Sequence, residues 1–397
     1  MTRIEARNAR WAVAATFAAN GFVTGAWAPQ IPLLLPRHGI GEATLGGLII
    51  LLGLGAVSAM LFTGRLIARY GSRRVLGVFA LTIVPVLPLV VLAPSVWLLG
   101  LAMALFGAMI GSMDVAMNAN AVEVERRLGY AIMSSSHGFW SLGGFFGGTA
   151  GAWAIAHWGA TAQALAVAAV ALAVVLAAMP LLRGEPPHPA VTEAGVAPRT
   201  RLVPREAGIW LLGAMALFSM VPEGAVLDWG ALYLGQELGA GTLQAGLGFA
   251  LFSGAMATVR FAGDALRNRF GAVRTLRVSG LIGAGGLMLA ALAPAAPVAI
   301  LGFMLAGFGV ANMVPILFSA AGNWPGHAAG SAISAVTMVG YAGILVAPGS
   351  IGFFAEHAGF RPTYAALALL LVLVAGLAGR AQAADGIARH DQMRPAT

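Results

Sequence analysis

Three acidic side chains lie within long apolar stretches of the sequence: Asp114, Glu223 and Asp228. A charged side chain at mid-bilayer costs about 2.5–3.5 kcal/mol on insertion scales, so it is retained mainly where it lines a polar cavity or has a partner. Protonation of a buried carboxylate relieves that penalty, which makes these residues candidates for proton coupling. No arginine lies comparably deep in the pattern. We therefore expect an acidic interior without a counter-charge, which disfavours organic anions as ligands.

The composition places these acids in a membrane protein. Of 397 residues, 59% are hydrophobic and 10% are charged, whereas about a quarter of a soluble domain is charged. Three stretches without Asp, Glu, Lys or Arg contain 39, 55 and 78 residues: 75–113, 128–182 and 278–355. One helical span needs about 20 apolar residues. The stretches do not alternate in polarity, which excludes a membrane β-barrel. The sequence therefore predicts an all-α polytopic membrane protein.

The apolar runs and their Gly, Pro and charge breaks predict twelve transmembrane helices in two pseudo-symmetric six-helix bundles. The spans are expected near 11–35, 43–63, 75–93, 97–121, 131–156, 161–182, 208–234, 243–262, 276–293, 297–321, 329–355 and 362–380. The predicted domains are an N-terminal bundle, a flexible proline-rich cytoplasmic linker, a C-terminal bundle and a cytoplasmic tail, at 1–182, 183–206, 207–380 and 381–397.

Basic residues set the predicted orientation. All 23 are arginine, and a cytoplasmic N-terminus leaves only Arg37 and Arg361 on the outer side. This asymmetry follows the positive-inside rule, so we expect both termini in the cytoplasm and a bacterial-type inner membrane as the location. The net charge of +8 is thereby explained by topology, and no nucleic-acid partner is expected.

Two loops repeat at an offset of 200 residues. Arg69-Tyr-Gly71 and Arg74 after the second span match Arg269-Phe-Gly271 and Arg274 after the eighth. The Gly-x-Gly pairs at 39–41 and 239–241 keep the same offset. Any inner loop can collect arginine and glycine, but a shared register at two separate loops favours a duplicated six-span unit.

The stretch from Gly64 to Arg74 resembles the signature loop of the major facilitator superfamily, in which parallel halves of this kind are known. The acidic residue usual before the arginine is Ala68 here. Because that acid helps to close the cytoplasmic side in the family, we expect this part of the latch to be missing. The candidate gating residues are Arg69, Gly71, Arg73, Asp264, Arg269 and Gly271.

Three further segments are similar to the MosC/YbjJ-like group, relatives of the fucose permease family: 112–120, 223–229 and 315–319. The resemblance implies a secondary active transporter that works by alternating access, and it hints at inositol- or sugar-like solutes. It also places Asp114 where the fucose permease family has a protonatable carboxylate on span four. The family's acid on span one has no counterpart in the stretch 20–25.

Polar residues gather near Asp114 in the predicted N-terminal bundle. Helical geometry puts Asp114 and His137 at matched depth, about 10–13 Å from the turn between spans four and five, so the two side chains could pair. The alternative is a structural hydrogen bond that locks two helices. The other candidates for solute binding are Asn20, Thr24, Trp27, Asn118 and Trp140, and a packed helix face would explain the first three equally well.

In the C-terminal bundle, Pro222 and Gly224 flank Glu223, so we expect an unwound segment of span seven near mid-membrane that lines the solute path. Asp228 lies nearer the outer mouth. Trp229, beside Asp228, and Asn312 in span ten are the remaining candidates for solute binding.

These features predict a symporter for a small polar solute (a sugar, polyol or amino-sugar) with proton coupling through Asp114, Glu223 and Asp228. The alternative is multidrug or organic-cation efflux by proton antiport. An enzyme is disfavoured because the Ser, Asp and His residues show no nucleophile–base spacing. A transport ATPase is disfavoured because a chain without lysine has no phosphate-binding G-x-x-x-x-G-K motif. We expect no cofactor and no metal. The expected partners are the solute, protons and the lipid bilayer, and the expected state is a monomer.

Overall fold

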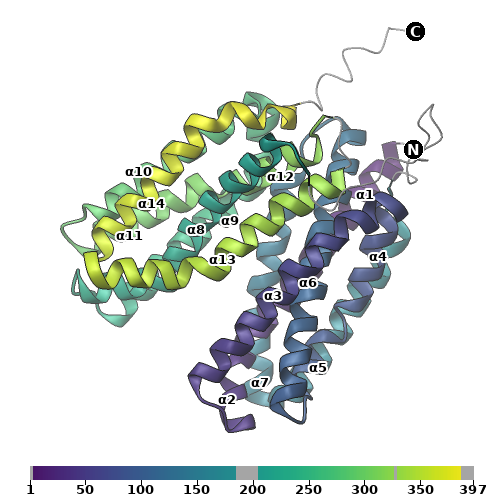
Figure 1. The fold of residues 1–397 in the computed structure, drawn as a ribbon, viewed down its shortest axis with the longest axis horizontal. Helices are drawn as coiled ribbons and strands as arrows, with labels where there is room; N and C mark the ends of the chain where they lie inside the picture. Colours follow the sequence, from purple (N-terminus) through teal and green to yellow (C-terminus); the bar gives the residue numbers. More distant parts are fainter. Residues whose placement is uncertain (1–2, 185–203, 326–328, 386–397) are drawn as a thin grey trace. The chain divides into compact units, whose positions relative to one another are not determined.

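The computed structural model describes residues 3–184, 204–325 and 329–385, and within these ranges it contains helices and no strand (Figure 1). The α-helices are α1 (Arg3–Trp27), α2 (Ile31–His38), α3 (Glu42–Tyr70), α4 (Ser72–Thr82), α5 (Val86–Val91), α6 (Val96–Leu128), α7 (Met133–Ala178), α8 (Ala207–Gln236), α9 (Thr242–Phe270), α10 (Ala272–Ala291), α11 (Ala296–Val310), α12 (Met313–Gly322), α13 (Ala329–Ala358) and α14 (Phe360–Leu377). Short 3₁₀ segments are η1 (Ala28–Gln30), η2 (Met179–Leu181) and η3 (Ala378–Asp385).

Eight segments of the described chain are long and apolar enough to cross a membrane. They are Thr44–Tyr70, Ser72–Val91, Val96–Leu128, Trp153–Leu181, Ala207–Gln236, Ala296–Gly322, Ala329–Ala358 and Phe360–Asp385. The all-helical membrane class is thus as predicted. Helices suit the hydrocarbon core because most backbone N–H and C=O groups are paired within the helix itself.

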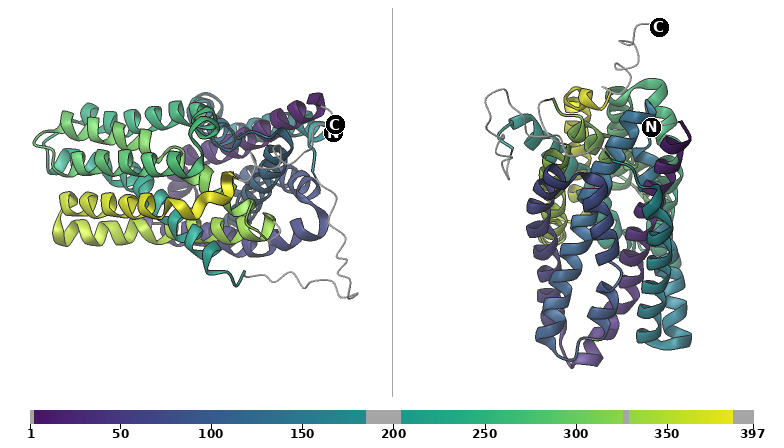
Figure 2. Two further views of the ribbon diagram at one scale, coloured as in Figure 1. Left: turned by 90° about the horizontal axis from the view of Figure 1, so that it is seen from above. Right: turned by 90° about the vertical axis from the view of Figure 1, so that its right-hand side faces the viewer.

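The chain divides into two compact units, each described by itself below. The first unit comprises Met1–Leu128, Ser136–Arg205 and Gly326–Met338, and the second comprises Gly129–Ser135, Glu206–Pro325 and Val339–Thr397. In both units the long helices run lengthwise beside one another (Figure 2). Most of the predicted linker, 185–203, and the end of the predicted tail, 386–397, lie outside the described residues.

The 200-residue repeat is present in the backbone as well as in the sequence. The bounds of α3 and α9 differ by 200 residues. Gly71 (φ 81°) and Gly271 (φ 80°) make the turns that follow these helices, in a region that L-residues with a side chain rarely adopt. A further pair, Gly159 (φ 83°) and Gly359 (φ 89°), keeps the same offset, although the sequence pattern did not reveal it.

Helices α1 and α7 approach each other closely in the first unit because glycines line their contact. A Cβ placed on Gly21 would lie 2.0 Å from the carbonyl oxygen of Trp140, and one on Gly25 would lie 2.1 Å from that of Gly144. On the facing helix, a Cβ on Gly143 would lie 2.1 Å from the carbonyl oxygen of Ala18. Small residues permit such backbone contact between membrane helices. This packing brings the polar residues of α1 next to those of α7.

Two prolines of the second unit have different effects on their helices. The unwound segment expected around Pro222 is not formed, because α8 continues from Ala207 to Gln236 with Pro222 inside it. That expectation was wrong, since a proline removes a single backbone bond and a long helix can tolerate the loss. The chain instead leaves the helix between Val310 and Met313, where α11 ends and α12 begins, shortly before Pro315.

Candidate functional site

Asn20 joins three helices of the first unit. Its Oδ1 accepts a hydrogen bond of 2.9 Å from Nε1 of Trp140 on α7, and its Nδ2 donates to the carbonyl oxygen of Ile110 on α6 at 3.3 Å. Thr24 lies one turn further along α1, and its hydroxyl donates to the carbonyl oxygen of Asn20 at 2.9 Å. Asn20 is buried, and Thr24 and Trp140 are partly buried. The side chain of Asn20 thus hydrogen-bonds both neighbouring helices, and its predicted contact with a solute stays a prediction.

Asp114 and His137 do not form the expected pair. Nε2 of His137 lies 3.1 Å from Oδ1 of Asn118, and Nδ2 of Asn118 donates to the backbone carbonyl of Asp114 at 2.9 Å. Among the described residues, Oδ2 of Asp114 is buried and has no hydrogen-bond partner. Asn118 is one helical turn beyond Asp114 on α6, so the amide takes the position beside the imidazole that we expected for the carboxylate.

Trp27 lies at the end of α1 and packs against Phe106 of α6, with ring centroids 5.6 Å apart. Its side chain is buried, with 8% exposed. Within the first unit, Trp27 is therefore a packing residue, and its predicted contact with a solute stays a prediction.

Glu223 has a counter-ion in the second unit. Nη2 of Arg260 on α9 lies 3.6 Å from Oε2 of Glu223 on α8, and the arginine side chain is 7% exposed against 31% for the glutamate. The expectation of an interior without an internal positive charge was wrong here. The predicted span ended at 262, whereas α9 continues to Phe270, which places Arg260 about 15 Å from the helix end at 1.5 Å per residue.

The break between α11 and α12 supplies polar groups next to Arg260. Pro315 has no N–H, so the carbonyl of Ala311, four residues earlier, lacks its helical donor. Nε of Arg260 donates to that carbonyl oxygen at 3.5 Å, a long hydrogen bond. The proline thus explains why a buried guanidinium finds a backbone acceptor at this position.

Asn312 lies at the same break and is 1% exposed. Among the described residues, neither Nδ2 nor Oδ1 of its amide has a hydrogen-bond partner. The amide lies against α9, where a Cβ on Gly263 would come within 2.0 Å of Oδ1. A buried amide without partners is uncommon in folded proteins and calls for a ligand, a water or a second conformation.

The two other candidates on α8 differ in their surroundings. Asp228 is exposed, which agrees with a position at a rim rather than in a core. Trp229 packs against Phe360 with centroids 6.1 Å apart, and a Cβ on Gly352 would lie 2.8 Å from its ring. Its Nε1 is buried and has no partner among the described residues.

Asp264 caps the start of α7. Its Oδ1 accepts a hydrogen bond from the backbone N–H of Ser134, and its Oδ2 accepts one from that of Ser135, both at 2.9 Å. A carboxylate at a helix N-terminus satisfies unpaired donors and interacts favourably with the helix dipole. Four residues further along α9, Oδ1 of Asn268 accepts from the N–H of Ala131 at 2.9 Å. Asp264 was predicted as a gating residue, whereas Asn268 was missed. Asn268 stands 200 residues after Ala68, the position at which the family usually has its acidic loop residue, and this offset could have revealed Asn268 as a candidate.

The remaining gating candidates flank the turns of the two repeated loops. The Arg69 guanidinium lies 5.2 Å from the ring of Tyr70, and the Arg269 guanidinium lies 5.4 Å from the ring of Phe270. Gly71 and Gly271 make the turns, and Arg73 is exposed beside Gly71. After Gly271, the N–H of Ala272 donates to Oδ1 of Asp385 at 2.6 Å. The arginines thus lie at the helix ends, as predicted.

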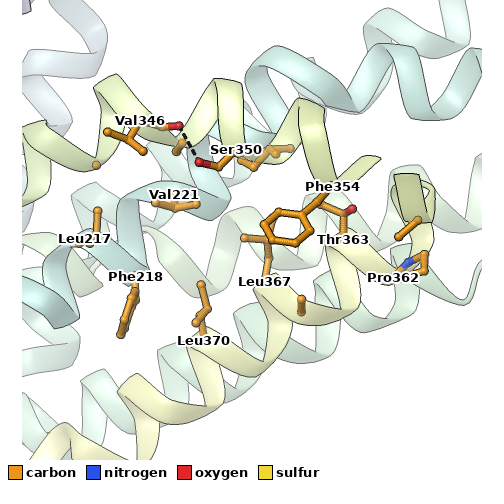
Figure 3. A pocket seen from close by; sticks show the side chains of 15 residues that line it. Leu217, Phe218, Val221, Val346, Ser350, Phe354, Pro362, Thr363, Leu367 and Leu370 are labelled. Atoms are coloured by element: carbon orange, nitrogen blue, oxygen red, sulfur yellow. Dashed lines mark hydrogen bonds between the residues drawn. The ribbon is translucent and has the colours of Figure 1, made fainter. Parts of the chain in front are cut away.

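An apolar groove of about 560 Å³ lies on the second unit and contains none of the predicted site residues (Figure 3). Its wall comes from α8, α13 and α14, including Val221, Phe354 and Leu367. The hydroxyl of Ser350, on this wall, donates to the backbone carbonyl of Val346, as Figure 3 shows. The groove offers little to a polar solute.

A family model described as Major Facilitator Superfamily matches residues 13–348 and 229–385 of the chain. The chain belongs to the Major Facilitator Superfamily. Within the superfamily it is 38% identical over 362 residues to an uncharacterized MFS-type transporter of Yersinia pestis, which covers 90% of this chain and 92% of the relative. It is 30% identical over 369 residues to the membrane protein MosC of Rhizobium meliloti, covering 92% of this chain and 87% of MosC. This chain is therefore a membrane transporter and not an enzyme.

Solved structures of the superfamily share the fold. A crystal structure of FucP in the outward conformation matches with a TM-score of 0.77 at 15% identity, covering 93% of this chain and 97% of FucP. The human organic anion transporter MFSD10 matches with a TM-score of 0.72 at 18% identity, covering 95% of this chain and all of that protein. Proteins of this fold thus include one described as a fucose:proton symporter and one described as an organic anion transporter, so the fold alone does not fix the solute.

Proposed function

We propose that the chain is a proton-coupled symporter that moves a small polar solute, such as a sugar, polyol or amino-sugar, by alternating access. The observation that carries the proposal is the carboxylate of Asp114, which is buried within a membrane-spanning helix next to the hydrogen-bonded Asn118 and His137. A structure of similar fold is that of the fucose:proton symporter of E. coli, and its solute class supports the proposal.

The proposed architecture has twelve spans in two six-helix bundles, with the domain bounds predicted above. Besides the eight apolar segments, four helical stretches have 20 residues or more: α1, the part of α7 before Gly159, α9 and α10. These four helices are less hydropathic than the eight apolar segments because they contain arginines, or glycine and polar residues. We further propose a bacterial inner membrane, cytoplasmic termini and a monomer.

We propose that the solute contacts Asn20, Thr24, Trp27, Asn118, His137, Trp140, Glu223, Trp229 and Asn312. In the second unit, the pair of Arg260 and Glu223 has no net charge and offers donors next to acceptors. Such a pair suits neighbouring hydroxyl groups, since the guanidinium donates to one oxygen and the carboxylate accepts from the next. The unpartnered amide of Asn312 can donate and accept in the same way.

Among the three acids proposed for proton coupling, Asp114 is the principal one. Glu223 has a guanidinium partner and Asp228 is exposed, whereas Asp114 is 6% exposed and has no counter-ion among the described residues. Burying a carboxylate without a partner is expensive, and a proton removes that expense. A proton taken up by Asp114 therefore changes the energy of the site more than one taken up by the other two acids.

We propose that Asp264, with the turns at Gly71 and Gly271 and the arginines beside them, controls opening at the cytoplasmic side. Asp264 supports this role because it binds the segment Gly129–Ser135, which groups with the second unit while the rest of α7 belongs to the first. Release of the two hydrogen bonds would free the start of α7 to move.

The test is uptake by purified protein in liposomes, using a panel of sugars, inositols, amino-sugars and organic cations with and without an inward proton gradient. We expect a hydroxylated solute to accumulate only with the gradient. Asp114→Asn should abolish accumulation but retain solute exchange at equal concentrations, because the side chain keeps its shape. Gradient-driven accumulation by Asp114→Asn at the wild-type level would refute proton coupling through Asp114.

Efflux of organic cations or drugs is the second candidate, and the apolar groove of about 560 Å³ favours it. In the same panel, this function predicts movement of hydrophobic cations against the proton gradient and no response to polyols. Narrowing the groove with Ala366→Phe should then reduce transport, whereas sugar transport should be unaffected by that change.

A further inference from the structure

A second groove, on the first unit, combines apolar walls with an arginine. It measures about 350 Å³ and is lined by Leu66 and Tyr70 of α3 and by Arg74, Val75, Val78 and Phe79 of α4. Both helices belong to membrane-spanning segments, so the exposed side chains of Leu66, Tyr70 and Val78 meet hydrocarbon rather than water. The groove is therefore open to the lipid phase.

Positive charge predominates around this groove, although Glu123 of α6 accepts a hydrogen bond of 2.8 Å from the hydroxyl of Ser72 at the start of α4. The stretch 64–76 carries four arginines and no acidic residue: Arg65, Arg69, Arg73 and Arg74. Arg74 is exposed in the first turn of α4, and among the described residues it has no ion-pair or hydrogen-bond partner. Since the apolar lining starts beside Arg74 and continues for about one helical turn to Val78, a charged end and an apolar wall adjoin.

We propose that this groove, the lipid groove, binds one acyl chain of an anionic phospholipid whose phosphate contacts Arg74. A phosphate oxygen accepts hydrogen bonds from the guanidinium, and the chain lies along Leu66, Val75 and Val78. Basic residues at the end of a membrane helix attract the anionic lipids of the cytoplasmic leaflet. A zwitterionic headgroup gains less here, because the four arginines of the stretch 64–76 repel its ammonium group.

The second repeat provides a matched comparison. Arg274 stands 200 residues after Arg74, but Thr275 and Ser279 replace Val75 and Phe79. An acid also lies at the start of that helix, where Oδ1 of Asp385 accepts from the N–H of Ala272. The counterpart thus keeps the arginine and the apolar residues Leu266, Phe270 and Val278, but two hydroxyl side chains make its wall more polar.

The experiment measures binding of phosphatidylglycerol, phosphatidylethanolamine and phosphatidylcholine to the full-length protein in detergent, by native mass spectrometry and by the shift in melting temperature. We expect phosphatidylglycerol to bind most tightly. Arg74→Gln should weaken it by about five- to tenfold, the effect of one arginine near a lipid surface. Arg274→Gln is the control and should change binding by less than twofold. Val78→Trp, which fills the groove and keeps all charges, should also weaken binding.

Three outcomes would overturn the proposal. The first is equal binding of the three lipids, which would indicate apolar adsorption. The second is an equal loss in Arg74→Gln and Arg274→Gln, which would indicate general attraction by positive charge. The third is a melting-temperature shift of the same size with soluble glycerophosphoglycerol, which would indicate a phosphate site without an acyl chain. Unchanged solute binding by Arg74→Gln, where a solute is known, shows that the variant is folded.

Discussion

Replacing Asp264 with asparagine should loosen the start of α7. The carboxylate is 8% exposed and accepts two backbone hydrogen bonds of 2.9 Å, from Ser134 and Ser135. A hydrogen bond to a charged group contributes about 1.5–3 kcal/mol, and a neutral one contributes about 0.5–1.5 kcal/mol. Asparagine has one acceptor oxygen, so it keeps one neutral bond and loses the other bond altogether. The expected loss is about 2–4 kcal/mol in this contact.

Amide hydrogen exchange at Ser134 and Ser135 measures that loss directly, because these N–H groups are the donors. Every 1.4 kcal/mol is a factor of ten, so exchange should become roughly 30- to 700-fold faster in Asp264→Asn if local opening limits it. Exchange in the core of α6 should stay unchanged. In transport, the same change should shift the protein toward the state in which this contact is broken.

Asp385→Asn is the matched control, because Asp385 caps α10 of the same unit through the N–H of Ala272 and does not touch the segment Gly129–Ser135. It should accelerate exchange at the start of α10 only. The reasoning is refuted if Asp264→Asn changes exchange at Ser134 and Ser135 by less than threefold, or if Asp385→Asn accelerates it equally.

Three further predictions concern packing and pairing. Gly21→Ala should destabilise the protein by about 1–3 kcal/mol, because its Cβ would meet a backbone oxygen at 2.0 Å. Gly224→Ala, with nothing within 4 Å of its Cβ, should be neutral or stabilising by up to about 1 kcal/mol. Melting temperatures in detergent measure both effects, and equal shifts would contradict the close packing of α1 against α7. Arg260→Gln and Glu223→Gln should each lower the free energy of unfolding, and the double variant should lose about 1–2 kcal/mol less than the sum of the two single losses. Single losses that simply add in the double variant would show that the two side chains do not stabilise each other. Trp140→Phe should lower stability by about 1–2 kcal/mol because Oδ1 of Asn20 loses its donor, and an unchanged melting temperature would show that this hydrogen bond does not contribute.

The sequence by itself determined the membrane class, the helical content and the duplication. These follow from one-dimensional patterns, because the length of apolar runs limits what can cross a bilayer and a shared register of 200 residues favours a duplicated unit. The loop glycines Gly71 and Gly271 were recognised from their repeated positions, and both adopt a positive φ, for which few residues other than glycine are suited. The resemblance to the major facilitator superfamily was visible in the first of these loops, and the family model agrees with it.

Only the tertiary structure decided which polar groups pair. Matched depth suggested Asp114 for His137, but depth does not fix rotation about the helix axis, and Asn118, one turn away, takes the position. The hydropathy pattern predicted that the eighth span ends at residue 262, eight residues before the end of α9. Arg260 was therefore expected at a helix end, and neither its burial nor its pairing with Glu223 was predicted. Likewise, Pro222 and Pro315 look alike in sequence, yet only the second adjoins a break, because the packing of neighbouring helices decides whether a chain leaves its helix.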